Sequence, residues 1–423
     1  MTEHDAGVVV VGAGLGAVRL AGNLRNGGYT GPITLVGAEP YAPYDRPPLS
    51  KSVLLGKDDR VELKPAEYYH ESEITLRLGT RVESVDPETR TIAIRSVNDA
   101  ASDGSGGIDN LSCDTLSCDT LSYDTLVLAT GLVPRTIPGS EGLAGVHVLR
   151  TFDDAVGVRE EIDAARTAVV IGAGFIGCEV AASLAERGLN VTLIEPAPTP
   201  LAAALGTTVG ELITRMHTER GVDVRVGVGV DELVGDTSVR AVRCSDGTEI
   251  PADIVVVGIG SIPVTDYLEG SSITLADRAD GGGVACDGVG RTSAPAVFAL
   301  GDVANWHDEK GAPRRVEHWN HTVDQAVVVA RQILSECAAE VAEQAAAEPI
   351  PYFWSDQFGL KLQVLGSPRA DHDLHLVSDD GTKFLGYYSC DGILTAVVGM
   401  GKAGAVMKTR PKLQTPTPVS ELL

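Results

Sequence analysis

Basic residues, long apolar runs and cysteine motifs are scarce in this sequence. The 34 Lys and Arg are outnumbered by 58 Asp and Glu, which gives a formal net charge of −24. Nucleic acids and anionic membranes need a basic footprint, so this deficit excludes both as the main partner class. No apolar stretch approaches the ~18 residues of a membrane span. The acidic opening, Met1 to Asp5, is not typical of a secretory signal.

The seven cysteines form no CxxC motif, and their number is odd. A disulfide framework is therefore not indicated, and we expect free thiols in a reducing cytoplasm. His318 and His321 are isolated, and no group of His, Cys and Asp has metal-ligand spacing. The sequence predicts no metal site.

What the chain does contain is a βαβ pattern that occurs twice in its 423 residues, a length typical of two to four domains. In the first copy, the apolar run from Gly7 to Val11 predicts a buried parallel strand. A Gly-rich turn, a helix over 18–25 and a strand over 33–36 follow it. In the second copy a strand over 168–171 leads through another Gly-rich turn into a helix over 178–187 and a strand over 191–194.

The stretch between the two copies is unusual. Residues 98–110 are rich in Asp, Ser, Gly and Asn, which predicts a surface loop. Three copies of a five-residue repeat follow over 111–125, and the last leads into a strand over 126–129. A period of five fits neither strand nor helix, so we interpret the first two copies as an insert that lengthens the loop.

Further downstream, strands are predicted at 254–257 and 297–300, and an Ala-rich helix at 323–347. Beyond Pro351, aromatic and β-branched residues alternate with polar ones, and Asp380-Gly381 is typical of a hairpin turn. These features predict a separate, mainly antiparallel C-terminal domain.

The two Gly-rich turns have the spacing that dinucleotide binding requires. The first Gly makes the tight turn, the second admits a pyrophosphate, the third allows close packing, and the helix N-terminus supplies N–H donors. An acid about 20 residues later binds ribose hydroxyls. The residues in these positions are Gly12, Gly14, Ala17 and Glu39 in the first copy, and Gly172, Gly174, Gly177 and Glu195 in the second.

Glu195 helps to determine whether the second turn binds NADH or NADPH. A carboxylate accepts hydrogen bonds from free ribose hydroxyls and repels a 2′-phosphate, and no Arg or Lys occurs over 196–200. The sequence therefore favours NADH over NADPH. The alternative is that Glu195 only caps a loop. Asp302, at another strand end, is suited to bind a ribityl hydroxyl, to cap a helix starting at Val303, or to do both.

Six stretches, in order along nearly the whole chain, resemble those of the FAD-dependent, NADH-using ferredoxin and rubredoxin reductases of bacterial oxygenase systems. The main departures are Ala17 and the insert around 98–120. The stretches are Pro43 to Lys51, Ala129-Thr130-Gly131, the second Gly-rich turn with Glu179, Leu300 to Asp302, Val316 to Trp319, and Pro351 to Gln357.

The resemblance implies FAD on the first turn and NADH on the second, with the two rings stacked. It assigns Arg46 and Lys51 to the FAD side, with Lys51 near the reactive flavin nitrogen and Glu179 opposite it. A cation there stabilises the charge of a reduced flavin, and a carboxylate keeps the lysine charged. The alternatives are a solvated lysine and an exposed helix position. Further expected cofactor contacts are Ala129, Thr130, Gly131, Gly260, Trp319 and Trp354, although core packing remains open for both tryptophans.

Disulfide-reducing relatives of this architecture carry a cysteine pair near the flavin, but residues 46–54 contain none. Cys113 and Cys118 have a C-x4-C spacing but lie in the repeat insert, far along the chain from the flavin turn. Cys178 follows a phosphate turn on a helix and is expected to pack in the core. We therefore expect no thiol relay.

The function that follows is an NADH-dependent ferredoxin reductase. It takes a hydride from NADH and passes single electrons to a small iron–sulfur ferredoxin of the 2Fe-2S type, or to a rubredoxin, serving an oxygenase. A basic patch for an acidic ferredoxin is expected, and the alternative is solubilising surface charge. Two short stretches supply the candidates, which are Arg314, Arg315, Lys402, Lys408, Arg410 and Lys412.

The expected fold is α/β, with two Rossmann-like dinucleotide-binding domains and a C-terminal α+β domain that has an antiparallel sheet. The FAD domain is predicted at 1–134 and 253–335, the NAD domain at 135–252 and the C-terminal domain at 336–423. A monomer or weak dimer is expected. The alternatives are an NADH oxidase or disulfide-type reductase, and a signalling flavoprotein whose association state responds to NADH.

Overall fold

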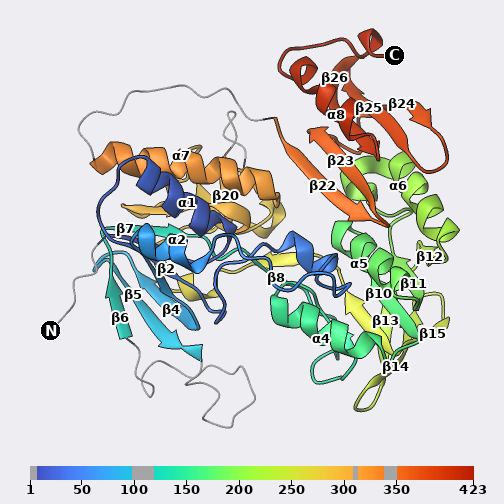
Figure 1. Ribbon diagram of the computed structural model, residues 1–423, viewed down its shortest axis with the longest axis horizontal. Helices are drawn as coiled ribbons and strands as arrows, with labels where there is room; N and C mark the ends of the chain where they lie inside the picture. The colour runs from blue at the N-terminus through green and yellow to red at the C-terminus, as the bar shows by residue number, and fades with distance from the viewer. Residues whose placement is uncertain (1–6, 98–118, 308–312, 338–349) are drawn as a thin grey trace. The chain divides into compact units, whose positions relative to one another are not determined.

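The computed structural model describes residues 7–97, 119–307, 313–337 and 350–423 (Figure 1). Two compact units are present. One comprises Met1–Asp45, Val61–Val133 and Ile262–Ala347, and the other Arg46–Arg60, Pro134–Ser261 and Glu348–Leu423. The predicted division into three domains stays a prediction. Within the described segments, no helix is both long and apolar enough to cross a membrane.

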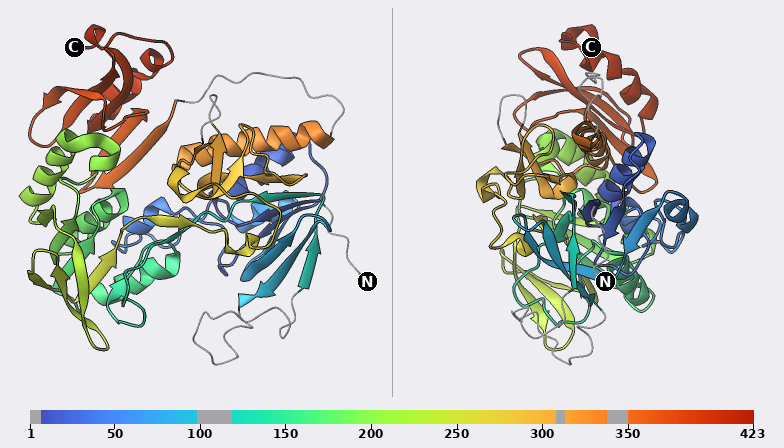
Figure 2. Two further views of the ribbon diagram at one scale, coloured as in Figure 1. Left: turned by 180° about the vertical axis from the view of Figure 1, so that it is seen from behind. Right: turned by 90° about the vertical axis from the view of Figure 1, so that its left-hand side faces the viewer.

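The first unit is built on a five-stranded parallel sheet in the order β19-β7-β1-β2-β3. The four valines of β1 are buried on both faces, as expected of a central parallel strand. Helices α1 and α7 pack side by side against this sheet (Figures 1 and 2). The elements are β1 (Val8–Val11), α1 (Leu15–Asn26), β2 (Ile33–Val36), α2 (Ala66–Glu71), β3 (Ile74–Arg77), β7 (Thr125–Leu128), β19 (Val297–Ala299) and α7 (Trp319–Cys337).

Helix α7 begins before the predicted start at residue 323, and the predicted residues 338–347 lie outside the described part of the chain. Several short sheets are also present, one of which pairs β8 with β17. These strands are β4 (Thr80–Asp86), β5 (Thr91–Ser96), β6 (Asp119–Ser122), β8 (Leu132–Pro134), β17 (Ser261–Pro263), β18 (Val284–Cys286), β20 (Ala304–His307) and β21 (Pro313–Arg314).

The interpretation of the repeat as a loop insert is partly wrong. Asp119 and Thr120, from its second copy, belong to β6 and pair with β5. The physical reason is that Leu121 is buried while its neighbours are exposed, so the segment has a strand's alternation. The predicted loop over 98–110 and the earlier repeat residues lie outside the described segments.

The second unit contains another five-stranded parallel sheet, in the order β12-β11-β10-β16-β9. Its helix α4 begins with a capping box, in which Thr151 and Asp154 exchange side-chain and backbone hydrogen bonds. The elements are β9 (Val146–His147), α4 (Phe152–Ile162), β10 (Thr167–Ile171), α5 (Phe175–Glu186), β11 (Asn190–Glu195), α6 (Ala202–Glu219), β12 (Asp223–Val226), β13 (Val230–Gly235), β14 (Val239–Cys244), β15 (Glu249–Pro251) and β16 (Ile254–Val257).

The same unit ends in the predicted antiparallel sheet, in the order β22-β23-β26-β25-β24, with a hairpin between β24 and β25. This sheet shares a hydrophobic core with α5 and α6, in which Leu362 and Val398 pack with Val180 and Ile213. The core therefore fixes β22 against α5. The elements are β22 (Tyr352–Gln357), β23 (Leu360–Gly366), β24 (Asp373–Asp379), β25 (Phe384–Cys390), β26 (Ile393–Met400) and α8 (Ala403–Lys408).

Candidate functional site

The first Gly-rich turn connects β1 to α1 and is open to a ligand. A Cβ on Gly12 would overlap the carbonyl oxygen of Ala129, whereas a Cβ on Gly14 would meet nothing within 4 Å. Helix α1 begins without a side-chain cap and without an acid in its first turn, as far as the described residues go. Its N-terminal N–H groups and the space over Gly14 therefore fit a pyrophosphate. Ala17, in the third position, is fully buried.

The second Gly-rich turn repeats this geometry between β10 and α5. A Cβ on Gly172 would overlap the carbonyl oxygen of Gly258, and a Cβ on Gly177 would overlap that of Gly172. A Cβ on Gly174 would again meet nothing within 4 Å. In each turn the first and third positions hold small residues that lie in close packing. The middle glycine, Gly14 or Gly174, leaves space for a ligand.

Both predicted acids have hydrogen-bond partners in the structure. Tyr44 donates its hydroxyl to Glu39 Oε2 at 2.5 Å in the first unit. In the second, Glu195 at the end of β11 accepts the N–H of Ala173 on Oε2 at 2.7 Å and that of Ala197 on Oε1 at 2.9 Å. The Ala173 bond joins the carboxylate to the Gly-rich turn itself. A carboxylate at this place suits ribose hydroxyls.

Four further predicted contacts, Ala129, Thr130, Gly131 and Asp302, lie at strand ends of the first unit. Residues Ala129 to Gly131 follow β7 beside Gly12, and the Thr130 hydroxyl donates to the Val264 carbonyl at 2.9 Å. Asp302 follows β19, in a single 3-10 turn over Gly301–Val303. The alternative role of Asp302 as the cap of a helix starting at Val303 is wrong, because strand β20 begins at Ala304 directly after that turn.

The predicted tryptophans are both half-buried. Trp319 begins α7 and donates its indole N–H to Asp45 Oδ1 at 2.9 Å. Trp354 on β22 stacks on Tyr352 with ring centroids 5.9 Å apart. Neither side chain is fully buried, and both the flavin contact and the core-packing alternative stay predictions.

Arg46, Lys51 and Gly260 belong to the second unit. Arg46 donates to the Arg150 carbonyl at 2.6 Å, and the Gly260 carbonyl accepts the N–H of Arg135 at 3.0 Å. The resemblance assigns Arg46 and Lys51 to FAD, and this assignment stays a prediction.

The central pair of the second unit is Lys51 and Glu179. Lys51 Nζ lies 2.7 Å from Glu179 Oε2, and the glutamate side chain is only 2% exposed. Glu179 stands on α5 shortly after the turn at Gly177. The two alternatives, a solvated lysine and an exposed glutamate, are wrong, because the ion pair is held in a nearly closed environment.

Glu179 has three more donors, which the sequence did not reveal. The Ser50 hydroxyl donates to Oε2 at 2.5 Å, the Ser355 hydroxyl to Oε1 at 2.8 Å, and the Asp356 N–H to Oε1 at 3.2 Å. Ser50 and Ser355 lie within stretches that carry the family resemblance. Nothing in their local pattern indicates that both face one carboxylate, since that depends on packing of β22 against α5.

The described cysteines form no disulfide, and Cys178 is buried. Its Sγ lies 3.6 Å from the Ala173 carbonyl oxygen, and burial raises the pKa of the thiol well above its usual range. The expected packing role is confirmed. Cys113 and Cys118 lie outside the described residues.

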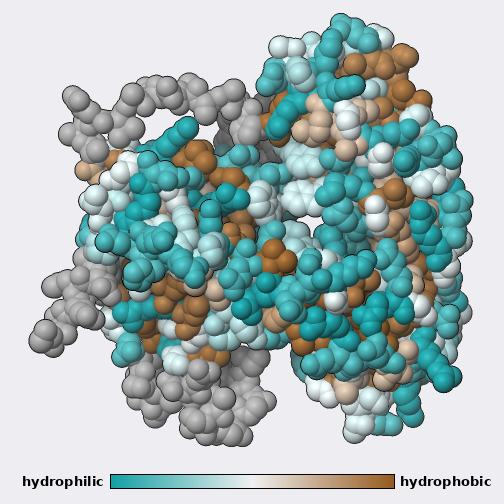
Figure 3. Space-filling view, viewed as in Figure 1, coloured by the Kyte–Doolittle hydropathy of each residue, from teal (hydrophilic) through white to brown (hydrophobic). Residues whose placement is uncertain are grey.

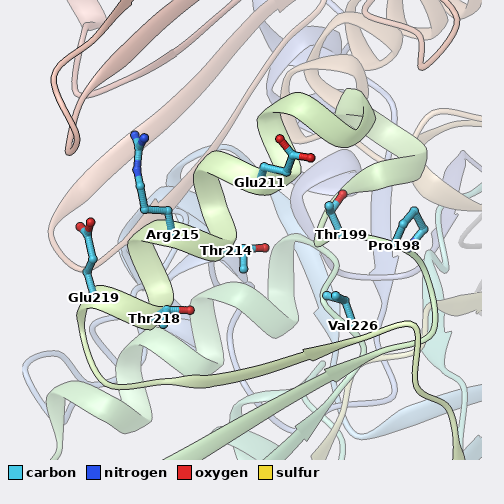
Figure 4. Close-up of a pocket in the computed structure, with 8 residues that line it drawn as sticks. All are labelled: Pro198, Thr199, Glu211, Thr214, Arg215, Thr218, Glu219 and Val226. Carbon is cyan, nitrogen blue, oxygen red and sulfur yellow. The ribbon is translucent and has the colours of Figure 1, made fainter.

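A shallow pocket of about 450 Å³ lies beside α6, and one of its lining residues, Val226, pairs with Glu195 between strands β12 and β11 (Figure 4). Most of its lining comes from one face of that helix. The lining residues are Pro198, Thr199, Glu211, Thr214, Arg215, Thr218, Glu219 and Val226.

The predicted basic patch is only partly available for docking. Arg315 is 12% exposed and pairs with Glu317 at 2.6 Å, while Lys412 pairs with Glu421 at 3.0 Å. Lys408 and Arg410 are exposed at the end of the chain and have no ion pair with another described residue. The face in Figure 3 is mostly hydrophilic, with scattered hydrophobic patches.

Comparisons with known proteins identify the family of this chain. A family model described as pyridine nucleotide-disulphide oxidoreductase matches residues 6–326, and one described as reductase C-terminal matches residues 352–421. A ferredoxin–NAD(P)+ reductase of Sphingomonas is 36% identical, with 94% of this chain and 90% of the relative covered. The ferredoxin–NAD+ reductase component of a p-cumate 2,3-dioxygenase system from Pseudomonas putida is 34% identical, with 86% and 82% covered.

Among solved structures, a covalent putidaredoxin reductase–putidaredoxin complex has a TM-score of 0.86 at 29% identity, over 99% of this chain and 95% of that one. A persulfide reductase from A. fulgidus, at 23% identity and a TM-score of 0.82, shares the fold. The family uses FAD and a nicotinamide nucleotide. The chain belongs to the pyridine nucleotide-disulphide oxidoreductase family, among the ferredoxin reductases with a reductase C-terminal domain.

Proposed function

We propose that this protein is an FAD-dependent reductase of the cytoplasm, which oxidises NADH and delivers single electrons to a 2Fe-2S ferredoxin serving an oxygenase. The observation that carries this proposal is the buried Lys51–Glu179 ion pair beside the second Gly-rich turn. Relatives over most of the chain are components of dioxygenase systems, which supports an oxygenase as the final acceptor.

The residues at both turns fit the two cofactors. The space over Gly14 and over Gly174 accommodates a pyrophosphate, and both helix N-termini present N–H groups towards it. We assign FAD to the first turn, with Glu39 on its ribose, and NADH to the second, with Glu195. FAD, when bound, accepts a hydride from NADH and releases electrons singly.

Lys51 and Glu179 prepare the second unit for this chemistry. The Lys51 ammonium would stabilise negative charge that develops close to it, and such fixed charges need no reorganisation during the reaction. Glu179 offsets the charge of the lysine and fixes its direction through the 2.7 Å contact. A nearly closed environment strengthens both effects, since water screens them less.

Glu195 supplies the nucleotide preference. Its two oxygens already accept the N–H groups of Ala173 and Ala197, so the carboxylate has a fixed direction and remaining lone pairs for ribose hydroxyls. A 2′-phosphate at the same place would meet an uncompensated negative charge. We therefore assign NADH rather than NADPH.

The absence of cysteine over 46–54 favours this function over a disulfide reductase. The test is NADH-dependent reduction of cytochrome c by the FAD-loaded protein, with and without added 2Fe-2S ferredoxin. We expect turnover that depends on ferredoxin and is unchanged after thiols are alkylated. Turnover of a disulfide without ferredoxin, or loss of activity on alkylation, would contradict the proposal.

A further inference from the structure

We infer that Ser355 and Ser50 are positioning residues, which fix the Glu179 carboxylate so that Lys51 stays aligned for hydride transfer. This inference rests on the proposed function for its catalytic consequence. The arrangement itself is a feature of the second unit alone, which contains all four residues.

Each of the two serines donates a hydrogen bond to a different oxygen of the Glu179 carboxylate. Ser50 donates to Oε2, the oxygen that also contacts Lys51, while Ser355 and the Asp356 N–H donate to Oε1. A carboxylate held at both oxygens cannot rotate about its terminal bond without breaking bonds in a buried site. The ion pair therefore has one geometry rather than several.

Ser50 is itself fixed from both sides. It lies in the 3-10 turn Pro47–Ser50, and its carbonyl accepts the Ser183 hydroxyl at 2.8 Å. Ser183 is on α5, the helix that carries Glu179. Lys51, the next residue, also donates to the Pro47 carbonyl at 3.0 Å. One helix thus positions both the glutamate and the segment that carries its two partners.

The direction of the Ser355 bond is set by a chain of donors. Gln357 Nε2 donates to Ser355 Oγ at 3.1 Å, so the single hydroxyl hydrogen of Ser355 is left for Glu179. Gln357 Oε1 in turn lies 3.0 Å from His217 Nε2, which must carry the hydrogen because the amide oxygen only accepts. Ser355, Gln357 and His217 are all buried.

This chain of donors makes the C-terminal sheet part of the site. Its members come from β22 and α6, and every bond points towards the carboxylate as the final acceptor. Burial lowers the pKa of His217 to about 4, so near neutral pH the ring is neutral and its Nε2–H tautomer donates to Gln357. Strand β22 therefore helps to position the Lys51 ammonium, because its Ser355 holds the Glu179 carboxylate that pairs with Lys51.

The experiment compares Ser355→Ala with Ser389→Ala in the FAD-loaded protein. Ser389 is a buried serine of the same antiparallel sheet, whose hydroxyl bonds to His375 instead. We expect S355A to lower the rate of flavin reduction at saturating NADH about ten-fold with an unchanged NADH dissociation constant, because it removes alignment rather than binding. S389A should leave both constants unchanged, and S50A should resemble S355A.

A double-mutant cycle tests whether Ser355 acts through Glu179 or only contributes to packing of the sheet. In the Glu179→Ala background S355A should cause no further loss of rate, and the two substitutions should be non-additive in urea unfolding of the FAD-free chain. Additive effects, or S355A behaving like S389A, would overturn the inference. If the wild type is not reduced by NADH, the proposed function fails, while the unfolding cycle still tests the serine–glutamate coupling.

Discussion

Lys51 and Glu179 are 128 positions apart in the sequence, yet their charged atoms lie 2.7 Å apart in one unit of the fold. The glutamate reaches the lysine because α5 starts at the second Gly-rich turn and the 47–50 turn is bonded to that helix through Ser183. The second Gly-rich turn and a fixed positive charge are thereby joined in one arrangement.

Glu179→Gln should slow flavin reduction by NADH roughly 10- to 100-fold, because Lys51 loses the charge that positions it. The measurement is the rate of flavin bleaching after rapid mixing with NADH. Glu186→Gln on the same helix is the matched control, since its pair with Lys57 is long and exposed and such pairs contribute little. Equal rates for the two variants would contradict a special role for Glu179.

Glu195→Gln should lower the preference for NADH over NADPH by about ten-fold in kcat/KM, because a neutral amide no longer repels a 2′-phosphate. Steady-state kinetics with both nucleotides measure this ratio. Glu211→Gln, an exposed change on neighbouring α6, should leave it unchanged. A preference that survives E195Q would mean that other residues select the nucleotide.

Charge reversal at Lys408 and Arg410 should raise the KM for an acidic ferredoxin roughly five- to ten-fold and reduce its dependence on salt. Flavin reduction by NADH should not change, since both residues are exposed at the chain end. Arg240→Glu, an exposed reversal on β14, serves as the control. If raised ionic strength leaves wild-type coupling to ferredoxin unaffected, the docking patch does not exist.

Stability should fall in mild acid because of His217. Burial lowers the pKa of this histidine to about 4 from an ordinary value of 6.5, so the unfolded chain binds its proton first. The resulting stability is complete above about pH 6.5 and is lost as pH falls towards 4, by roughly 1.4 kcal/mol per pH unit.

Urea unfolding of the wild type and of His217→Asn at several pH values in that window measures this contribution as a difference. The variant should lack the corresponding slope, while the background from other titrating groups cancels. A slope equal in both proteins would assign the acid sensitivity to groups other than His217.

The parallel strands and both Gly-rich turns could be predicted because their information is local. Four consecutive valines, a turn whose glycines have distinct steric roles and a helix stop after Asn26 occupy adjacent positions in the sequence. Helix α7, by contrast, begins four residues early, since its first turn carries polar and aromatic residues with little helical periodicity.

The polar partners of Glu179 could not be predicted from the residues alone. Ser50, Ser355 and Asp356 come from two distant segments, and their meeting depends on the core shared by the C-terminal sheet and α5. The basic patch was overestimated for a related reason. Whether Arg315 is exposed depends on Glu317 and on carbonyls that only the folded chain brings near.

Anaerobic rapid mixing of the FAD-loaded, thiol-alkylated wild-type protein with one equivalent of NADH tests the central claim most directly. The account predicts that NADH bleaches the flavin faster than overall turnover, that NADPH does so far more slowly, and that added ferredoxin restores the colour. A protein that retains no FAD, or whose bleaching disappears on alkylation, would contradict it.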